Sequence, residues 1–166
     1  MVPKIAEGGA SFVGAGAYYL GAAKAASIGE ASGGIRSYML GGSAADLDLS
    51  NGRVGFAETR NLSTDDPGEG FAVMQASFVR YQEMKKGARG RPLKDPVYSY
   101  SLSWAIDERP DQVAMIDAAE KTLELLGLSD HEAIFVSHID KPYDHIHVIV
   151  NRIKPDFTGV VSKSMD

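Results

Sequence analysis

The 166-residue sequence contains no cysteine, only one tryptophan and no long uninterrupted hydrophobic run. The absence of cysteine excludes disulfides and thiolate metal sites, so a bound metal would need histidine or carboxylate ligands. The most apolar stretch, residues 9–26, is too short and too interrupted by glycine and lysine to span a membrane. The residues before it do not resemble a secretory signal peptide, because Lys4 is their only lysine or arginine and Glu7 is acidic.

Positive charge is also scarce, with 17 lysine and arginine residues against 22 aspartate and glutamate residues. The net charge of −5 argues against a strong nonspecific nucleic-acid binder. A predicted basic loop over residues 85–95 is the local exception, and its cations are Lys85, Lys86, Arg89, Arg91 and Lys94. This loop could follow a phosphate backbone, although an ordinary solvated loop explains it equally well. Candidates for stacking on unpaired bases are Tyr38, Tyr98 and Trp104.

Apolar periodicity and capping signals predict helices and strands in a mixed order. Helices are expected within residues 11–26, 63–87 and 109–128, and strands at 3–6, 53–62, 97–106, 132–140 and 144–153. Asp66 is predicted to cap the second helix, with Pro67 as its first residue. The apolar face of the third helix is expected to contain Val113, Ile116, Leu123 and Leu126. Residues 27–52 are rich in glycine and serine and are predicted to form a mobile loop.

The last two predicted strands are joined only by Lys141, Pro142 and Tyr143. They must be antiparallel, because so short a link cannot cross over the sheet. Length and composition suit a single domain. The sequence therefore predicts an α+β fold, an α/β arrangement in two or three layers, with a mainly antiparallel central sheet of about five strands and flanking helices.

Three of the four histidines fall within ten positions of this hairpin. Side chains alternate faces along a strand, so His145 and His147 point the same way, and strand pairing brings His138 opposite them. Three neutral imidazoles at one point would bind a divalent metal and leave coordination positions free. Asp140 is predicted to share their face and to orient the His138 ring. The alternative is three polar residues on a solvent-facing sheet, and His131, on the other parity, is assigned no role in the site.

The pattern His-x-Asp, then His-x-His, then asparagine resembles the third motif of the DNA relaxases, or mobilisation nucleases, which are HUH endonucleases. In this chain the motif consists of His138, Asp140, His145, His147 and Asn151. The stretch Ser-Phe-Val-Gly followed by Tyr-Tyr-Leu, within residues 9–21, is similar to the family's tyrosine motif. Residues 57–67 and 96–104 resemble connecting segments of one bacterial branch. The resemblance runs over most of residues 9–158.

The resemblance implies metal-dependent, site- and strand-specific nicking of DNA at a transfer origin. A tyrosine oxygen would attack the scissile phosphate, leaving a 5′-phosphotyrosyl enzyme and a free 3′-hydroxyl. Family spacing, counted from Phe12, favours Tyr18 as the nucleophile and leaves Tyr19 as the alternative. The expected cofactor is Mg²⁺ or Mn²⁺, with Zn²⁺, Co²⁺ or Ni²⁺ as substitutes in vitro. Glu58 and Asp140 are candidate acceptors of the tyrosine proton, and neither is a strong one.

The family also suggests where DNA would lie. Ser101 and Ser103 share a face of the strand at 97–106 and could lie near DNA phosphates, although simple solvent exposure explains them as well. Asn151 of the histidine motif is a further candidate DNA contact. The implied partners are single-stranded DNA at the origin, accessory relaxosome proteins and a type IV secretion coupling protein, with no membrane. The implied location is the bacterial cytoplasm, with export alongside the DNA as an option, and the chain is expected to be the N-terminal nicking domain of a longer protein.

Three other functions remain open from the sequence. A small-molecule metalloenzyme with a three-histidine site would not need a tyrosine at residue 18 or 19. A replication initiator or transposase of the same superfamily commonly carries its tyrosine after the histidines, whereas here the tyrosines come first. The third is a DNA-binding relic without catalysis. Two further classes are excluded: the glycines lack the spacing of a nucleotide-binding loop, and Ser137 faces away from His138, which argues against a serine hydrolase.

Overall fold

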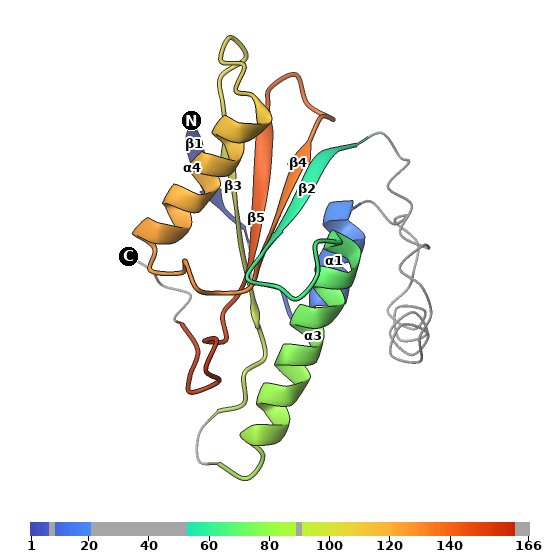
Figure 1. Ribbon diagram of the computed structural model, residues 1–166, viewed down its shortest axis with the longest axis vertical. Coiled ribbons are helices and arrows are strands. Elements are labelled where there is room, and N and C mark those ends of the chain that lie inside the picture. Colours follow the sequence, from blue (N-terminus) through green and yellow to red (C-terminus); the bar gives the residue numbers. More distant parts are fainter. Residues whose placement is uncertain (7–8, 21–52, 89–90, 162–166) are drawn as a thin grey trace.

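The computed structural model describes residues 1–6, 9–20, 53–88 and 91–161 (Figure 1). Its elements are β1 (Val2–Ile5), α1 (Phe12–Leu20), β2 (Val54–Arg60), α3 (Pro67–Met84), β3 (Val97–Ser103), α4 (Gln112–Leu125), β4 (Ala133–His138) and β5 (His145–Asn151). This order agrees with the prediction from periodicity. The predicted loop at residues 27–52, and the end of the helix predicted at 11–26, lie outside the described residues.

The five described strands form one sheet in the order β1-β3-β5-β4-β2, and every neighbouring pair is antiparallel. The hairpin of β4 and β5 lies within the sheet, with β5 in the central position. The α+β class with an antiparallel sheet and flanking helices is therefore confirmed. Strands that are distant in sequence become neighbours, because β3 lies beside β5 and β2 lies beside β4.

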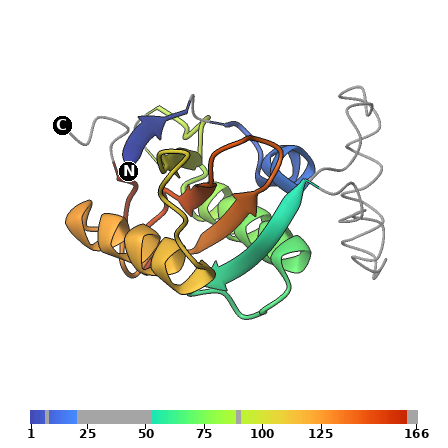
Figure 2. The same ribbon diagram turned by 90° about the horizontal axis from the view of Figure 1, so that it is seen from above.

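The sheet is covered on both faces, which makes three layers. Seen from above, α4 lies on one side of the sheet, and α1 and α3 lie on the other (Figure 2). Along β5, Ile146, Val148 and Val150 pack into the core under α4. Ile149 points the other way and packs with Ile134 into the core under α1 and α3. None of the described helices is long and apolar enough to cross a membrane.

Capping residues set the starts of the two longer helices. The Oδ1 atom of Asp66 accepts a hydrogen bond from the backbone N–H of Glu69 at 2.8 Å, and Pro67 is the first residue of α3, as predicted. The buried stripe of α4 consists of Met115, Ala119 and Leu123. The prediction that Val113 belongs to this stripe is wrong, since its side chain is 65% exposed. Val113 lies two residues, or about 200° of helix rotation, from Met115.

Gly16 fixes how closely α1 approaches α3. It is buried, and a Cβ atom built on it would lie 3.0 Å from ring carbons of Phe71 in α3. Any larger residue would push the two helices apart. Gly16 is therefore required by packing although glycine disfavours helices, and it positions the two tyrosines that follow in α1.

Candidate active site

The three histidines of the hairpin come together on the sheet face under α1. His138 is paired directly with His145, and His147 is paired with Val136. The ring centroids of His138 and His147 are 4.5 Å apart, and those of His145 and His147 are 5.2 Å apart. One ring nitrogen from each histidine lies within 4.8 Å of those from the other two. The paired strands thus bring three potential ligand atoms to one point.

These histidines do not form a solvent-facing surface. His138 and His145 are buried, and His147 is half-buried. Burial lowers the pKa of His138, and it lowers the pKa of His147 to about 3, with a further reduction from the neighbouring histidines. At neutral pH both rings are therefore uncharged and carry a nitrogen lone pair, which is the form that binds metals.

Backbone carbonyl groups orient two of the rings. The Nε2–H of His138 donates to the carbonyl oxygen of Tyr19 at 2.7 Å, which leaves its Nδ1 with a lone pair. In the same way, the Nδ1–H of His145 donates to the carbonyl oxygen of Tyr143 at 3.3 Å and leaves its Nε2 with a lone pair. Hydrogen bonds of this kind fix the tautomer of metal-binding histidines. The donor set of His138, His145 and His147 therefore fits a divalent transition-metal ion.

Asp140 does not have the partner predicted for it. Its carboxylate lies 3.4 Å from Nε of Arg53 and 3.6 Å from Nε2 of His145, whereas His138 is held by the carbonyl of Tyr19. The prediction assumed that strand alternation continues to Asp140, but β4 ends at His138 and the chain then turns. Asp140 thus connects the histidine cluster to an arginine and does not orient the His138 ring.

The two tyrosines of α1 have different environments. The ring of Tyr19 is buried, with its centroid 4.9 Å from that of His147 and 6.4 Å from that of His138. Its hydroxyl donates to Oγ of Ser99 at 3.2 Å. Burial raises the pKa of Tyr19, and the hydrogen bond with Ser99 partly offsets this effect. Of the described tyrosines, Tyr19 is the one whose ring contacts His138 and His147.

Tyr18 lies at the rim of the site and is 62% exposed. Its ring makes an edge contact with the ring of Tyr19, at a centroid distance of 4.9 Å. The guanidinium carbon of Arg53 lies 5.2 Å from the centroid of Tyr18, and Nη1 of Arg53 donates to its carbonyl oxygen at 3.4 Å. Sequence reasoning missed Arg53, because it belongs to no motif. It reaches the site because it precedes Val54, which is paired with His138, and nothing local in the sequence indicates that pairing.

Two polar residues of β3 lie beside the histidines. Ser101 is paired with His147, and Ser103 is paired with His145. Residues directly opposite each other in an antiparallel pair project to the same face, so both serines share the face of the histidines. Both are half-buried. The structure therefore brings these two predicted residues next to the cluster.

Glu58 and Asn151 are excluded from their predicted roles. The carboxylate of Glu58 contacts Arg60 and Gln112 on the opposite face of the sheet, so Glu58 cannot accept a proton in this site. Asn151 is 1% exposed and lies at the far end of β5. Its side chain donates to Glu132 at 2.7 Å and accepts from the backbone N–H of Ile153 at 3.0 Å. Its burial and these hydrogen bonds favour a structural role over a contact with DNA.

The predicted stacking aromatics do not line the site either. Tyr98 is buried, and it packs with Tyr100 into the core under α4. Trp104 is partly buried against the same core, and Tyr38 lies outside the described residues. His131 is buried, with its Nδ1 atom 2.7 Å from the carbonyl oxygen of Asn151. It is separate from the cluster, in agreement with the prediction.

The described part of the basic loop lies at the other end of the sheet from the histidines. It follows the lower end of α3 in Figure 1, whereas the turn between β4 and β5 is at the upper end. Val97, just after Lys94, is paired with Asn151, about 20 Å along β5 from His145. Lys85 and Lys86 contact Thr158 and Glu83, and Arg89 lies outside the described residues. The loop and the histidine cluster are thus not brought together.

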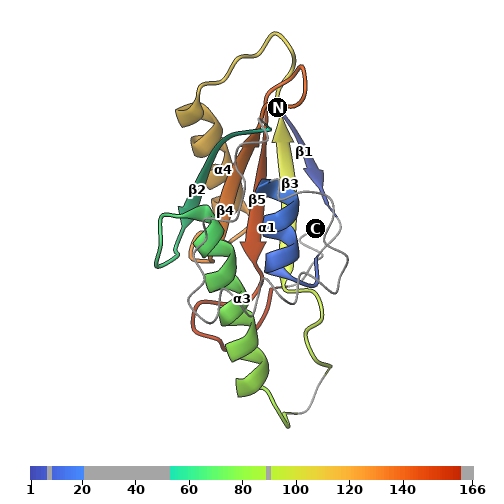
Figure 3. The same cartoon turned by 90° about the vertical axis from the view of Figure 1, so that its right-hand side faces the viewer.

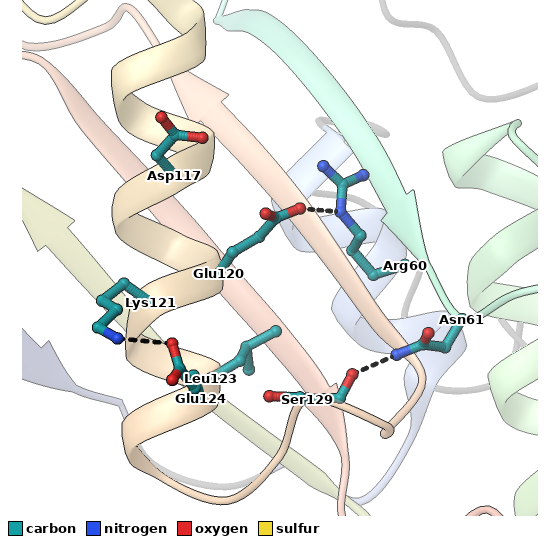
Figure 4. Close-up of a pocket in the computed structure, with 8 residues that line it drawn as sticks. All are labelled: Arg60, Asn61, Asp117, Glu120, Lys121, Leu123, Glu124 and Ser129. Atoms are coloured by element: carbon teal, nitrogen blue, oxygen red, sulfur yellow. Dashed lines mark hydrogen bonds and ion pairs between the residues drawn. The ribbon is translucent and has the colours of Figure 1, made fainter.

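A pocket on the α4 side of the sheet is also separate from the histidines (Figure 4). Most of its lining residues are charged, and four of them form two ion pairs. Nε of Arg60 lies 2.6 Å from Glu120, and Nζ of Lys121 lies 2.6 Å from Glu124. These ion pairs explain the polar lining, and the pocket adds no group to the candidate site.

Comparisons with known proteins agree with the motif. Residues 49–166 match the family described as "Relaxase: MobA/VirD2-like, nuclease domain", a range that includes the three histidines and leaves out the two tyrosines. The chain is also similar to Protein MobA of Acidithiobacillus ferrooxidans, with 35% identity over 68 residues. This similarity covers 41% of the chain and 17% of the length of that relative. The chain belongs to the relaxases and contains a MobA/VirD2-like nuclease domain.

Proposed function

We propose that this domain nicks one strand of DNA at a transfer origin by tyrosine transesterification. The observation that carries the proposal is the contact between the ring of Tyr19 and the ring of His147 in a buried three-histidine cluster. The reaction needs a phenol and a group that binds the scissile phosphate, and these lie side by side here. Membership of the relaxase family supports the same reaction.

We also propose that His138, His145 and His147 hold a divalent metal ion. Such an ion would polarise the scissile phosphate and stabilise the negative charge that gathers on its nonbridging oxygens. An all-imidazole donor set favours transition-metal ions over Mg²⁺, which prefers oxygen ligands. Mn²⁺ is therefore the proposed cofactor from the expected pair, with Zn²⁺, Co²⁺ or Ni²⁺ as substitutes.

In the proposed reaction, Oη of Tyr19 attacks phosphorus, and the bond from phosphorus to the 3′ oxygen breaks. A phosphotyrosyl bond forms at the 5′ side, and the 3′ oxygen takes up a proton to leave as a hydroxyl. Burial raises the pKa of Tyr19, so its proton must be removed within the site. Asp140, whose carboxylate contacts His145, is the proposed acceptor, with water as an intermediary.

The choice between the two tyrosines rests on position. Family spacing favours Tyr18, but the contacts of the rings favour Tyr19, because its ring lies against His147 and His138. We therefore propose Tyr19 as the nucleophile, with exposed Tyr18 beside Arg53 at the rim. By family membership, the proposed substrate is single-stranded origin DNA, and the proposed partners are relaxosome proteins and a secretion coupling protein.

The proposal is tested by trapping the covalent intermediate. The chain is incubated with Mn²⁺ and a random-sequence pool of labelled single-stranded DNA, and adducts that survive denaturing gels are recovered and sequenced. We expect adducts that disappear on chelation and in Tyr19→Phe, and that persist in Tyr18→Phe. Adducts that disappear only in Tyr18→Phe would show that Tyr18, and not Tyr19, is the nucleophile. If the wild-type chain forms no adduct, the proposed function is wrong.

A further inference from the structure

The sheet face that carries the histidines continues past them to the edge of the sheet. His147 is paired with Ser101 of β3, and Ser101 is paired with Lys4 of β1. A second row of cross-strand partners, two residues along the strands on the same face, consists of His145, Ser103 and Val2. Residues in one such row project to the same face, so Lys4 shares the face of the histidine cluster.

Helices cover only one part of this face. Phe12 of α1 and Met74 of α3 are buried in one core with Val136 of β4 and Ile149 of β5. Figure 3 shows no described helix in front of β1 on this side of the sheet. Lys4 is accordingly exposed, and the serines between it and the histidines are half-buried. We call the surface formed by Ser101, Ser103 and Lys4 the strip. Among the described residues, no helix covers it, so it is accessible to a ligand beside the histidine cluster.

The chemistry of the strip suits a phosphodiester backbone. Two hydroxyls, from Ser101 and Ser103, lead from the histidines towards the ammonium group of Lys4. Among the described residues, Lys4 has no ion-pair partner, whereas Asp140 is paired with Arg53 and Asp144 with Arg109. Lysine and serine side chains are common phosphate contacts in nucleic-acid complexes.

Distances also favour this strip over the basic loop. Lys4 lies two strand spacings, about 10 Å, from His147, whereas the basic loop follows the other end of the sheet. On the opposite side of the cluster, Arg53 precedes β2, so a cation flanks the histidines on each side. Because the chain has a net charge of −5, local cations must carry the attraction to a polyanion.

We propose that single-stranded DNA crosses the strands from the histidine cluster over Ser101 and Ser103, and that Lys4 on the edge strand binds a backbone phosphate. This inference rests on the proposed function, because it assigns the path of its substrate. It replaces the basic loop as the principal phosphate-binding segment.

The test is salt-dependent binding of labelled oligothymidine by the 166-residue chain in the presence of Mn²⁺. Removing one phosphate contact from a single-strand complex lowers the slope of log affinity against log salt by about 0.7. We expect Lys4→Gln to lower the slope by this amount and to weaken binding several-fold, with Lys4→Arg restoring both. Lys121→Gln is the matched control, because Lys121 lies on α4 across the sheet and should leave both quantities unchanged.

Equal affinity and slope for Lys4→Gln and wild type would overturn the inference, as would absence of oligothymidine binding. A loss confined to Lys94→Gln would also overturn it and would assign the DNA path to the basic loop. Covalent adduct formation shows whether the DNA path alone is wrong or the proposed nicking function is wrong as well. Adducts in the wild type, with unchanged binding by Lys4→Gln, contradict only the path. Absence of adducts contradicts the proposed function, whatever Lys4 does.

Discussion

Acidification should destabilise the metal-free protein, because half-buried His147, beside two other histidines, resists protonation in the folded state. Burial lowers its folded-state pKa to about 3, while the unfolded chain titrates near 6.5. Below pH 6.5 the unfolded state therefore binds more protons than the folded state, and stability falls as pH decreases towards 3. At pH 4.5 the loss from this one residue is on the order of 3 kcal/mol, because the pH then lies about two units below the unfolded-state pKa.

Urea denaturation at pH 7 and pH 4.5, with a chelator present, measures this effect. His147→Gln keeps a polar side chain but cannot titrate, so the difference between wild type and variant isolates the residue. We expect the variant to lose less stability than wild type over this range, by on the order of 3 kcal/mol. His138 also has a lowered pKa, so some acid sensitivity should remain in the variant. An identical pH dependence for both proteins would refute the reasoning, since His147 would then titrate as in water.

Three further predictions concern packing, the role of Asn151 and the metal. Gly16→Ala should lower the unfolding free energy by about 1–3 kcal/mol in urea, because its Cβ meets the Phe71 ring, whereas exposed Gly14→Ala should raise it slightly. Asn151→Ala should lower stability by about 1–3 kcal/mol, because Oε2 of Glu132 loses its hydrogen bond while Oε1 keeps the one from Ser77, and DNA affinity should be unchanged. Replacing any one histidine of the cluster by alanine should weaken Mn²⁺ binding in calorimetric titrations at least tenfold, and an unchanged affinity would exclude the cluster as the metal site.

Local sequence rules predicted the parts of the site that depend on strand geometry. Alternation along β5 gives the shared direction of His145 and His147, and the short link to β4 gives the position of His138. The start of α3 followed from Asp66 and Pro67 for the same reason, since capping depends on residues close in sequence. These features need no knowledge of which distant segments become neighbours.

The features that sequence reasoning missed depend on contacts between distant segments. The burial of the histidines comes from α1, which packs over the sheet, and the ring of His138 is held by the carbonyl of Tyr19. Arg53 enters the site because β2 pairs with β4 across 72 intervening residues, a pairing with no local signal. Asn151 matches the family motif, yet its partners Glu132 and Ile153 make it structural.

The path expected for DNA changed for the same reason. Charge clustering in the sequence favoured the loop at residues 85–95, but the pairing of Val97 with Asn151 places its described part at the far end of the sheet from the histidines. The strand order β1-β3-β5-β4-β2 brings Lys4, an isolated cation in the sequence, onto the face of the histidines. Strand order is set by long-range pairing, and composition carries no information about it.

We propose that a tyrosine of α1 and a metal ion held by the histidine cluster cleave a DNA strand together. Mass spectrometry of the covalent adduct formed with Mn²⁺ tests it most directly, because the modified peptide identifies the attacking residue. We expect a nucleotide attached to Tyr19, formed by wild type and Tyr18→Phe and absent after chelation. DNA cleaved without any protein-linked product, or with equal efficiency in the double variant lacking both hydroxyls, would contradict the proposal.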